Sequence, residues 1–165
     1  MKKHKDTIII IILTIILLCV GFYTMFIHVP YYEYHNNLTA IRNHIIETNR
    51  YNYLDYFNEH RGKQVYYILK IDNDGNPTYV AYDESLNLVD SYQGEMASIS
   101  DIKQAILDKY KDVLTEHDLD SIEVGYENNK FVYSVKVLKN KSILYIYYDL
   151  DDGEFLKAYH LKGDE

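Results

Sequence analysis

The sequence has one cysteine and no tryptophan in 165 residues. Cys19 lies inside an uncharged stretch, so the rest of the chain has neither disulfides nor cysteine metal sites and must be stabilised by packing. Tyrosine is abundant instead, with 19 residues that fall mostly in strand-like runs. This usage is typical of a core and a sheet surface rather than of a platform on which bases stack.

Positive charge is scarce after the first 27 residues. Residues 28–165 hold 14 Lys and Arg against 24 Asp and Glu, a net charge of −10 with His neutral. This acidity argues against nucleic acid as a partner. A surface this acidic would also be repelled by anionic lipid headgroups or anionic wall polymers, so any attraction of the whole domain should be to basic surfaces.

The sequence also lacks motifs that mark a catalytic site. No GxSxG, HExxH or phosphate-binding glycine loop occurs, and the histidines are scattered without ligand spacing. The run 72–75 (DNDG) begins like a calcium loop but lacks the distal Glu, so it predicts a hairpin turn. Asp83 and Asp149 could be paired carboxylates for acid–base work, but we expect them to cap the turns that follow. The sequence therefore predicts no enzyme activity, no metal and no cofactor.

What the sequence does have is a stretch of twenty residues, Ile8 to Ile27, without a charged side chain. A helix of that length spans about 30 Å, the thickness of a bilayer's hydrocarbon core. Lys2, Lys3 and Lys5 precede it, which predicts a cytoplasmic tail over residues 1–7 and an external C-terminal part. A cleaved signal peptide is the alternative, but no small-x-small cleavage site follows the stretch.

The segment after the span is expected to leave the membrane as a linker over residues 28–35, with Pro30 ending the helix. Tyrosines cluster here, as in an aromatic belt at the outer interface. An exported domain without disulfides fits a bacterium better than an animal secretory route. These features predict a single-pass protein of the cell membrane whose folded domain lies outside.

The external part has the pattern helix, strands, helix, strands. The first helical stripe begins at Asn36, and Gly62 is the expected end of that segment. A second helix is expected to begin near Ser98 or Ser100, because Ser98 and Asp101 have capping-box spacing. Alternation and turn residues predict strands over 64–71, 78–83, 86–92, 121–126, 130–138, 142–149 and 154–161.

One strand-rich segment from each half of the external part also aligns without gaps. A shift of 66 residues places Val65–Asp83 on Phe131–Asp149, with five identities in nineteen positions. Tyr67 then falls on Tyr133. Together with the repeated order of elements, this alignment indicates a duplication.

The duplication predicts an α+β fold of two units, residues 36–97 and 98–165, each a helix laid across an antiparallel sheet. Neither unit has much core of its own, so the two should pack together. By strand alternation, Leu69 and Val135 are expected to face the helices.

Several short runs in these segments match a known family. They are Gly62–Lys70 (GKQVYYILK), Asp74-Gly75, Tyr79-Val80, Ser100–Ala105 (SDIKQA), and Tyr147–Asp149 with Gly153, Leu156 and Lys157. On these runs the chain resembles the TseB-like (YpmB, DUF5590) family of low-GC Gram-positive bacteria, which is related to peptidase-propeptide (PepSY) domains. The resemblance implies two cystatin-like units, each a helix against a three-stranded antiparallel sheet. The first helix and residues 51–60 depart from the family pattern.

In function, the resemblance implies a non-enzymatic regulator of cell-wall elongation that binds a class B penicillin-binding protein, a transpeptidase, outside the membrane. The alternative is an inhibitor or chaperone of a secreted or wall-associated peptidase, because the related propeptide domains hold proteases inactive. Alternation leaves Tyr66, Tyr145 and Tyr147 on the outer sheet face, and these are the predicted partner surface. The competing interpretation is that some of them cover the junction between the two repeats.

Overall fold

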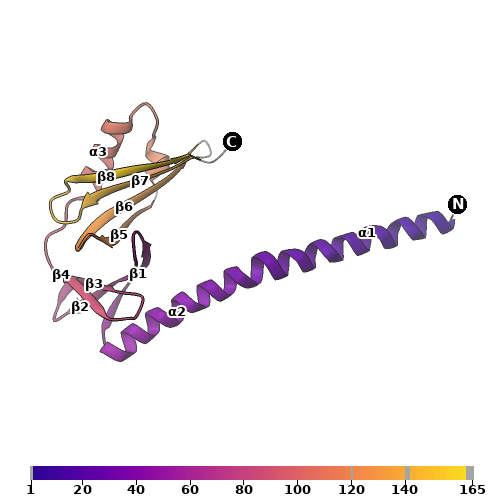
Figure 1. Ribbon diagram of the computed structural model, residues 1–165, viewed down its shortest axis with the longest axis horizontal. Coiled ribbons are helices and arrows are strands. Elements are labelled where there is room, and N and C mark those ends of the chain that lie inside the picture. Colours follow the sequence, from indigo (N-terminus) through magenta and orange to yellow (C-terminus); the bar gives the residue numbers. More distant parts are fainter. Residues whose placement is uncertain (1, 120, 140–141, 163–165) are drawn as a thin grey trace. The chain divides into compact units, whose positions relative to one another are not determined.

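The computed structural model describes residues 2–119, 121–139 and 142–162. Helices form its N-terminal part, and two antiparallel four-stranded sheets follow (Figure 1). The chain divides into two compact units, with the boundary between His44 and Ile45. Both sheets belong to the second unit, so the fold is mixed α+β with one compact body that holds both sheets.

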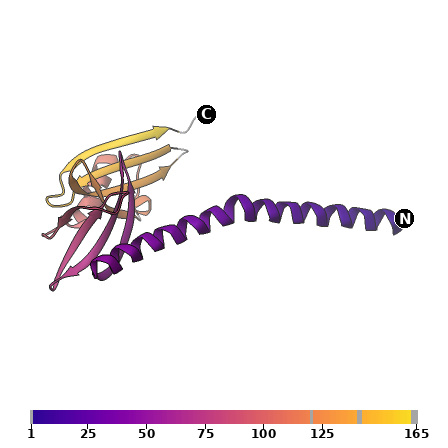
Figure 2. The ribbon, with the colours of Figure 1, turned by 60° about the horizontal axis from the view of Figure 1, so that its bottom comes forward.

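The N-terminal unit is helical throughout its described residues. Helix α1 (Lys2–Tyr23), the π-helical turn η1 (Thr24–His28) and helix α2 (Val29–Asn49) follow one another without a break (Figure 2). In the described part of the chain, one helical stretch, Ile10–Asn49, is long and apolar enough to cross a membrane, and its most apolar window is not buried. The predicted span over residues 8–27 overlaps this stretch from Ile10 onward, which is consistent with a membrane anchor.

Residues 28–35, predicted as a linker, are helical, and Pro30 does not end the helix. In a regular α-helix the proline ring collides with the carbonyl group four residues back. Here the Val29 N–H bonds the Thr24 carbonyl, five residues back, and this bond widens the turn just before the proline. We attribute the passage of the helix through Pro30 to the wider turn.

The first sheet contains a strand that the sequence pattern did not predict. Residues 52–61 were expected to continue the first helix, but they form β1, which pairs with β2. The register of this pair shifts between Tyr53 and Tyr56. Such a bulge breaks the two-residue alternation and leaves two tyrosines three residues apart, a spacing typical of a helix. The strands, in spatial order, are β1 (Asn52–Arg61), β2 (Val65–Asn73), β3 (Asn76–Tyr82) and β4 (Leu88–Tyr92).

The second sheet follows the prediction more closely. Helix α3 (Ile99–Tyr110) and the 3-10 turn η2 (Glu116–Leu119) precede it. Its strands, in spatial order, are β5 (Ile122–Glu127), β6 (Lys130–Lys139), β7 (Ser142–Asp149) and β8 (Phe155–Lys162). Each sheet therefore has four strands, not the three that the resemblance implied.

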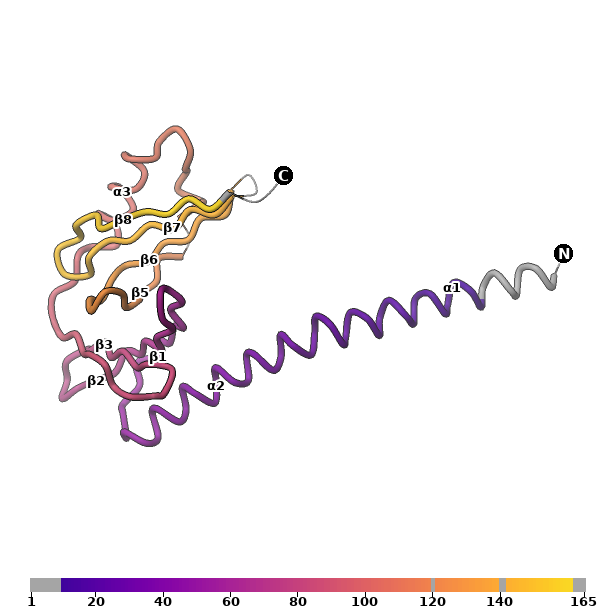
Figure 3. Tube along the Cα trace, in the orientation of Figure 1, coloured from indigo at the N-terminus to yellow at the C-terminus, as the bar shows by residue number. Residues whose placement is uncertain are grey.

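The two sheets are built alike. Each is a meander with its strands in sequence order, as Figure 3 shows for the second sheet. In the central hairpins, Tyr67 lies opposite Tyr82 and Tyr133 lies opposite Tyr148. The two pairs are related by the shift of 66 residues found in the sequence, so the predicted equivalence of Tyr67 and Tyr133 is confirmed.

The predicted turns are also confirmed. The Asp72 carboxylate accepts a hydrogen bond from the Gly75 N–H at 2.8 Å, which closes the hairpin between β2 and β3. Asp83 accepts from the Asn87 N–H at 2.8 Å. At the equivalent position, Asp149 accepts from the Asp151 N–H at 3.0 Å. Both carboxylates thus cap the turns after their strands.

The core of this unit lies where the first sheet, helix α3 and the second sheet meet. Buried residues from all three form one cluster, among them Ile68, Ala81, Ile102, Ile106, Val135 and Ile146. Because the cluster draws on both repeats, each sheet supplies part of the other's core.

The side chain of Tyr56 joins the two sheets at strand β5. Its hydroxyl accepts a hydrogen bond from the Val124 N–H at 2.7 Å and donates one to the Val124 carbonyl at 3.2 Å. The Asn58 amide donates to the same carbonyl at 3.0 Å. Side chains of the first sheet therefore satisfy the outward backbone groups of Val124 on an edge strand.

Candidate interaction surface on the second sheet

An exposed apolar surface lies on the outer face of the second sheet, the face opposite helix α3. Leu138 lies opposite Ile143, which in turn lies opposite Leu161; Tyr145 lies opposite Tyr159. Directly opposed residues share a face and contact one another. Leu138 is 72% exposed, Leu161 55% and Tyr159 47%, while Ile143 and Tyr145 are half-buried. These five side chains, called the outer apolar face below, form a patch across three strands of the kind that marks interaction sites.

Lysines border the outer apolar face. The Lys136 ammonium lies 5.9 Å from the Tyr145 ring centre, and the Lys157 ammonium lies 5.0 Å from that of Tyr159. Three lysines of β6 and β8 are paired with carboxylates: Lys130 with Asp149, Lys139 with Asp118 and Lys157 with Glu127. The lysines beside the outer apolar face therefore do not make this part of the surface strongly basic.

In the first sheet, the tyrosine at the equivalent position is covered by other side chains of the same chain. Tyr79 is the equivalent of Tyr145 by the 66-residue shift, and Lys70 lies 5.5 Å from its ring centre as Lys136 does from Tyr145. Tyr79 is only 8% exposed, because it packs in the core and the Tyr56 ring meets it edge-on at 5.5 Å. Tyr145 has the same lysine neighbour without that cover.

The other two predicted partner residues lie at the junction of the sheets. Tyr66 is half-buried, with its ring edge-on to Tyr126 at 5.0 Å. Tyr147 is 5% exposed and its ring lies edge-on to His60 at 6.1 Å. The three predicted tyrosines are thus not brought together, and only Tyr145 belongs to the outer apolar face.

A buried ionisable cluster at this junction was not predicted from the sequence. His60 of β1 is 5% exposed and its Nε2 lies 4.0 Å from the Glu127 carboxylate of β5. Glu127 also accepts a hydrogen bond from the Lys157 ammonium of β8. Burial lowers the pKa of His60, Glu127 opposes this shift and Lys157 adds to it. The histidine and the glutamate are 67 positions apart, and no local spacing in the sequence links them.

Gly125 makes room for this histidine. A Cβ at position 125 would collide with the His60 ring. By strand pairing, His60 lies opposite Tyr66 in the first sheet and Gly125 lies opposite Val132 in the second, and Tyr66 and Val132 are related by the 66-residue shift. His60 and Gly125 thus occupy equivalent positions in the two repeats and face each other. The glycine lacks a side chain where the histidine ring needs the space.

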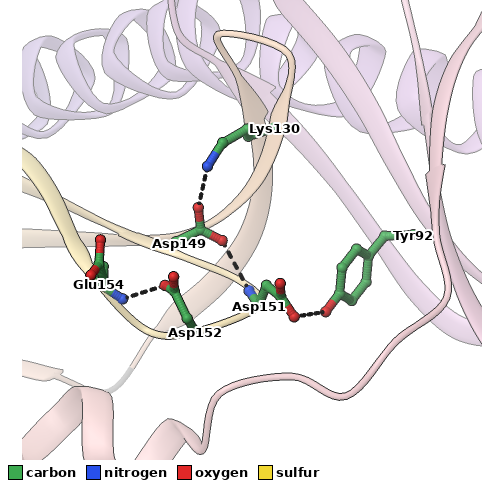
Figure 4. A network of polar contacts seen from close by, with 6 residues as sticks. All are labelled: Tyr92, Lys130, Asp149, Asp151, Asp152 and Glu154. Carbon is green, nitrogen blue, oxygen red and sulfur yellow. Dashed lines mark hydrogen bonds and ion pairs between the residues drawn. The ribbon is translucent and has the colours of Figure 1, made fainter.

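A second polar network surrounds the turn between β7 and β8 (Figure 4). Asp149 accepts a hydrogen bond from the Lys130 ammonium at 2.9 Å, and the Tyr92 hydroxyl of the first sheet donates to Asp151 at 3.0 Å. Burial raises the pKa of Asp149, but the Lys130 and Asp151 hydrogen bonds outweigh it and hold that pKa below its usual value. In the described residues, no group of three or more His, Cys, Asp or Glu side chains is placed to hold a metal ion. The network's contacts are those of a structural turn.

Comparison with known proteins supports the fold. No family model matches the sequence, and no curated protein matches it. Among solved structures, the YpmB protein from Bacillus subtilis is similar, with a TM-score of 0.53 and 20% sequence identity. The match covers 68% of this chain and 87% of that chain. The chain therefore has a YpmB-like fold, in agreement with the resemblance found in its sequence.

Proposed function

We propose that this chain is a membrane-anchored, non-enzymatic regulator of cell-wall elongation that binds a class B penicillin-binding protein outside the membrane. The kind of partner comes from the sequence resemblance to the TseB-like family, with which the YpmB-like fold agrees. The apolar N-terminal helix supports the anchor. In this proposal the N-terminus is cytoplasmic and the sheets lie outside the membrane of a Gram-positive bacterium.

The observation that carries the proposal is the outer apolar face, which includes Tyr145 and Tyr159. Aromatic side chains are enriched at the centres of protein interfaces, where they supply contact area at low entropy cost. Tyr145 is flanked by Tyr159 on the next strand and by the Lys136 ammonium. In the first repeat the equivalent tyrosine is covered by packing within the chain, so we infer that Tyr145 is covered by a partner.

The test is retention of the transpeptidase by the full-length chain. The tagged chain is purified in detergent from membranes of the source cell, and the captured class B penicillin-binding protein is quantified by mass spectrometry. Tyr145→Ala and Tyr159→Ala should each reduce its recovery at least tenfold, because central interface residues carry most of the binding energy. Catalysis by the chain itself is excluded from the proposal, so no turnover of wall fragments is expected.

Leu88→Ala is the matched control, because Leu88 is 54% exposed on β4 of the first sheet. Its recovery of the transpeptidase should equal that of the unchanged chain. Equal recovery with all three variants would contradict the assignment of the surface. Recovery of a secreted peptidase in place of a transpeptidase, with loss of peptidase activity in the complex, would contradict the proposed partner.

A further inference from the structure

His60 and Glu127 meet at the junction of the two sheets and leave two buried polar atoms without partners. His60 of β1 is 5% exposed and Glu127 of β5 is 7% exposed. Among the described residues, neither the imidazole Nε2 nor the carboxylate Oε2 has a hydrogen-bond partner. The two atoms lie 4.0 Å apart. Such unpaired buried groups are rare, and these two are close enough to bond after a small movement of either side chain.

The other oxygen of Glu127 is bonded to a lysine that reaches the outer apolar face. It accepts a hydrogen bond from the Lys157 ammonium. Strand pairing places Lys157 opposite Tyr147, on the same face of the sheet as Tyr159. The ammonium lies 4.7 Å from the ring centre of Tyr147 and 5.0 Å from that of Tyr159. Since Tyr159 belongs to the outer apolar face, Lys157 connects that face with the buried junction.

The charges that act on His60 come from this same cluster. In the described chain, the titratable side chains that face it from neighbouring strands are Tyr66 of β2, Glu127 of β5, Tyr147 of β7 and Lys157 of β8. Burial raises the pKa of Tyr147, which stays neutral, and the Tyr66 hydroxyl donates to Gln64 at 2.6 Å. On β1 itself, Glu59 and Arg61 pair with each other. Glu127 therefore favours the protonated imidazole and Lys157 opposes it.

Protonation of His60 would place two cations beside one carboxylate. With His60 neutral, Glu127 balances Lys157 alone. The imidazole is buried between the sheets, whereas the Lys157 side chain is 21% exposed and ends a flexible stem. The imidazolium attracts Glu127 and repels the ammonium. The lysine is therefore the cation that moves to water.

We propose that His60 is a proton sensor: its protonation closes the contact with Glu127 and releases Lys157 toward solvent beside Tyr159. The inference rests on the proposed function where it treats the outer apolar face as the partner surface. A released ammonium must lose water when an apolar partner covers Tyr159, so protonation weakens binding. Histidine is the side chain suited to this role, because its charge changes near neutral pH.

The test places one 3-fluorotyrosine at position 159 of the full-length chain in detergent. Its fluorine NMR signal is followed from about pH 7.5 to about pH 4.5, a range that spans histidine titration. Burial lowers the pKa of His60, so the signal should shift with a midpoint below pH 6.5. His60→Gln should abolish the shift. A constant signal, or one that still titrates in His60→Gln, would overturn the proposal.

Two controls separate this titration from other effects. His160→Gln removes the exposed histidine that follows Tyr159 on β8, and the shift should remain. Its loss would assign the titration to His160 and contradict the proposal. A fluorine at Tyr79, which is buried in the core, should give a constant signal over the same range. A parallel shift at Tyr79 would mean that the whole fold loosens, which also contradicts the proposal.

Lys157→Met tests the same link from its other end, without changing His60. It removes the cation that opposes protonation, so His60 should bind its proton at least about threefold more tightly. The nitrogen NMR shifts of the imidazole measure this, and the Tyr159 signal should no longer follow them. Lys136→Met is the matched control, because Lys136 lies beside Tyr145 on the same face; proton binding should stay unchanged. Unchanged proton binding in Lys157→Met would overturn the proposal.

A partner measurement separates failure of this inference from failure of the proposed function. Between about pH 7.5 and about pH 5.5, the unchanged chain should lose at least about threefold more of the recovered transpeptidase than His60→Gln does. The same dependence in both chains overturns the regulation and leaves the proposed partner in place. Absence of a transpeptidase at every pH contradicts the proposed function, and the fluorine titration then still decides whether His60 controls Lys157.

Discussion

The two sheets have the same register but different surroundings. In the central hairpin of the first sheet, both faces are buried: Leu69 and Val80 on one side, Ile68 and Ala81 on the other. In the hairpin of the second sheet, Val135 and its neighbours on the inner face are buried, while alternate residues toward the end of β6 are exposed. The hairpin sequence therefore sets the pairing, and the layers packed on each face set the burial.

Single positions make this difference concrete. Ile68 is fully buried, whereas its equivalent Ser134 is half-buried and polar. Tyr79 is covered by Tyr56, whereas its equivalent Tyr145 borders solvent. At these positions the first sheet has a covering layer and the second sheet has an open face. Four measurements can break or sharpen this comparison.

The largest effect is expected on the buried inner face. Val135 is 0% exposed, so Val135→Asp would bury an unpaired charge and should destabilise the fold by at least about 3 kcal/mol. Leu138, on the same strand but 72% exposed, should tolerate Leu138→Asp within about 0.5 kcal/mol. Urea unfolding of the full chain in detergent, followed by near-ultraviolet circular dichroism, measures both. Similar losses for the two variants would mean that the faces are assigned wrongly.

The second largest difference in stability is expected between variants of the equivalent tyrosines, Tyr79 and Tyr145. Tyr79→Ala removes a buried ring from the core and should cost about 3 kcal/mol. Tyr145→Ala removes a ring from the outer apolar face and should cost less than about 1 kcal/mol. The same unfolding measurement compares them directly. If Tyr145→Ala proved as costly as Tyr79→Ala, the outer face would be covered within the chain and would not be free for a partner.

A smaller loss is expected where the repeats face each other at His60. Gly125→Ala places a methyl group against the buried His60 ring and should destabilise the fold by about 1–3 kcal/mol. In a His60→Ala background the same change should lower the unfolding free energy much less, because the imidazole ring that meets the methyl group is absent. A double-mutant cycle of unfolding free energies measures the coupling. Strictly additive losses would contradict the contact.

The smallest effect is a dependence of stability on pH. Burial lowers the pKa of His60 below its usual value of 6.5, so the folded chain holds this imidazole neutral while the unfolded chain protonates it first. The resulting stability is present above pH 6.5 and is lost as the pH falls below it toward the folded pKa. His60→Gln should flatten that part of the stability curve, measured by melting temperature at a series of pH values. An unchanged slope would assign the dependence to other groups.

The sequence predicted the parts of this fold that local patterns govern. The hairpin register followed from the alignment of Val65–Asp83 with Phe131–Asp149, because pairing in a hairpin depends on nearby turn and apolar positions. The segment of β1 was assigned to a helix, because its bulge removes strand alternation. The sequence also predicts that the helix ends at Pro30, and the structure differs because the π-helical turn before the proline has no recognised sequence signal.

The candidate surface was predicted in part for a related reason. Alternation assigned Tyr66, Tyr145 and Tyr147 to outer sheet faces, but it does not reveal which faces a second layer covers. Tyr66 and Tyr147 contact residues of the other sheet, and such contacts between distant segments depend on the tertiary packing.

The hydrogen bonds of the Tyr56 hydroxyl bear on whether fragments of this chain can fold separately. It gives and receives a hydrogen bond at the backbone of a single residue, Val124, in the other repeat. Burial raises the pKa of Tyr56, which keeps the hydroxyl protonated and able to do both. A fragment ending before residue 98 would leave this hydroxyl and the apolar Ile68 face without partners, and a fragment beginning there would expose the edge of β5. Neither segment is therefore expected to fold when it is separated from the other.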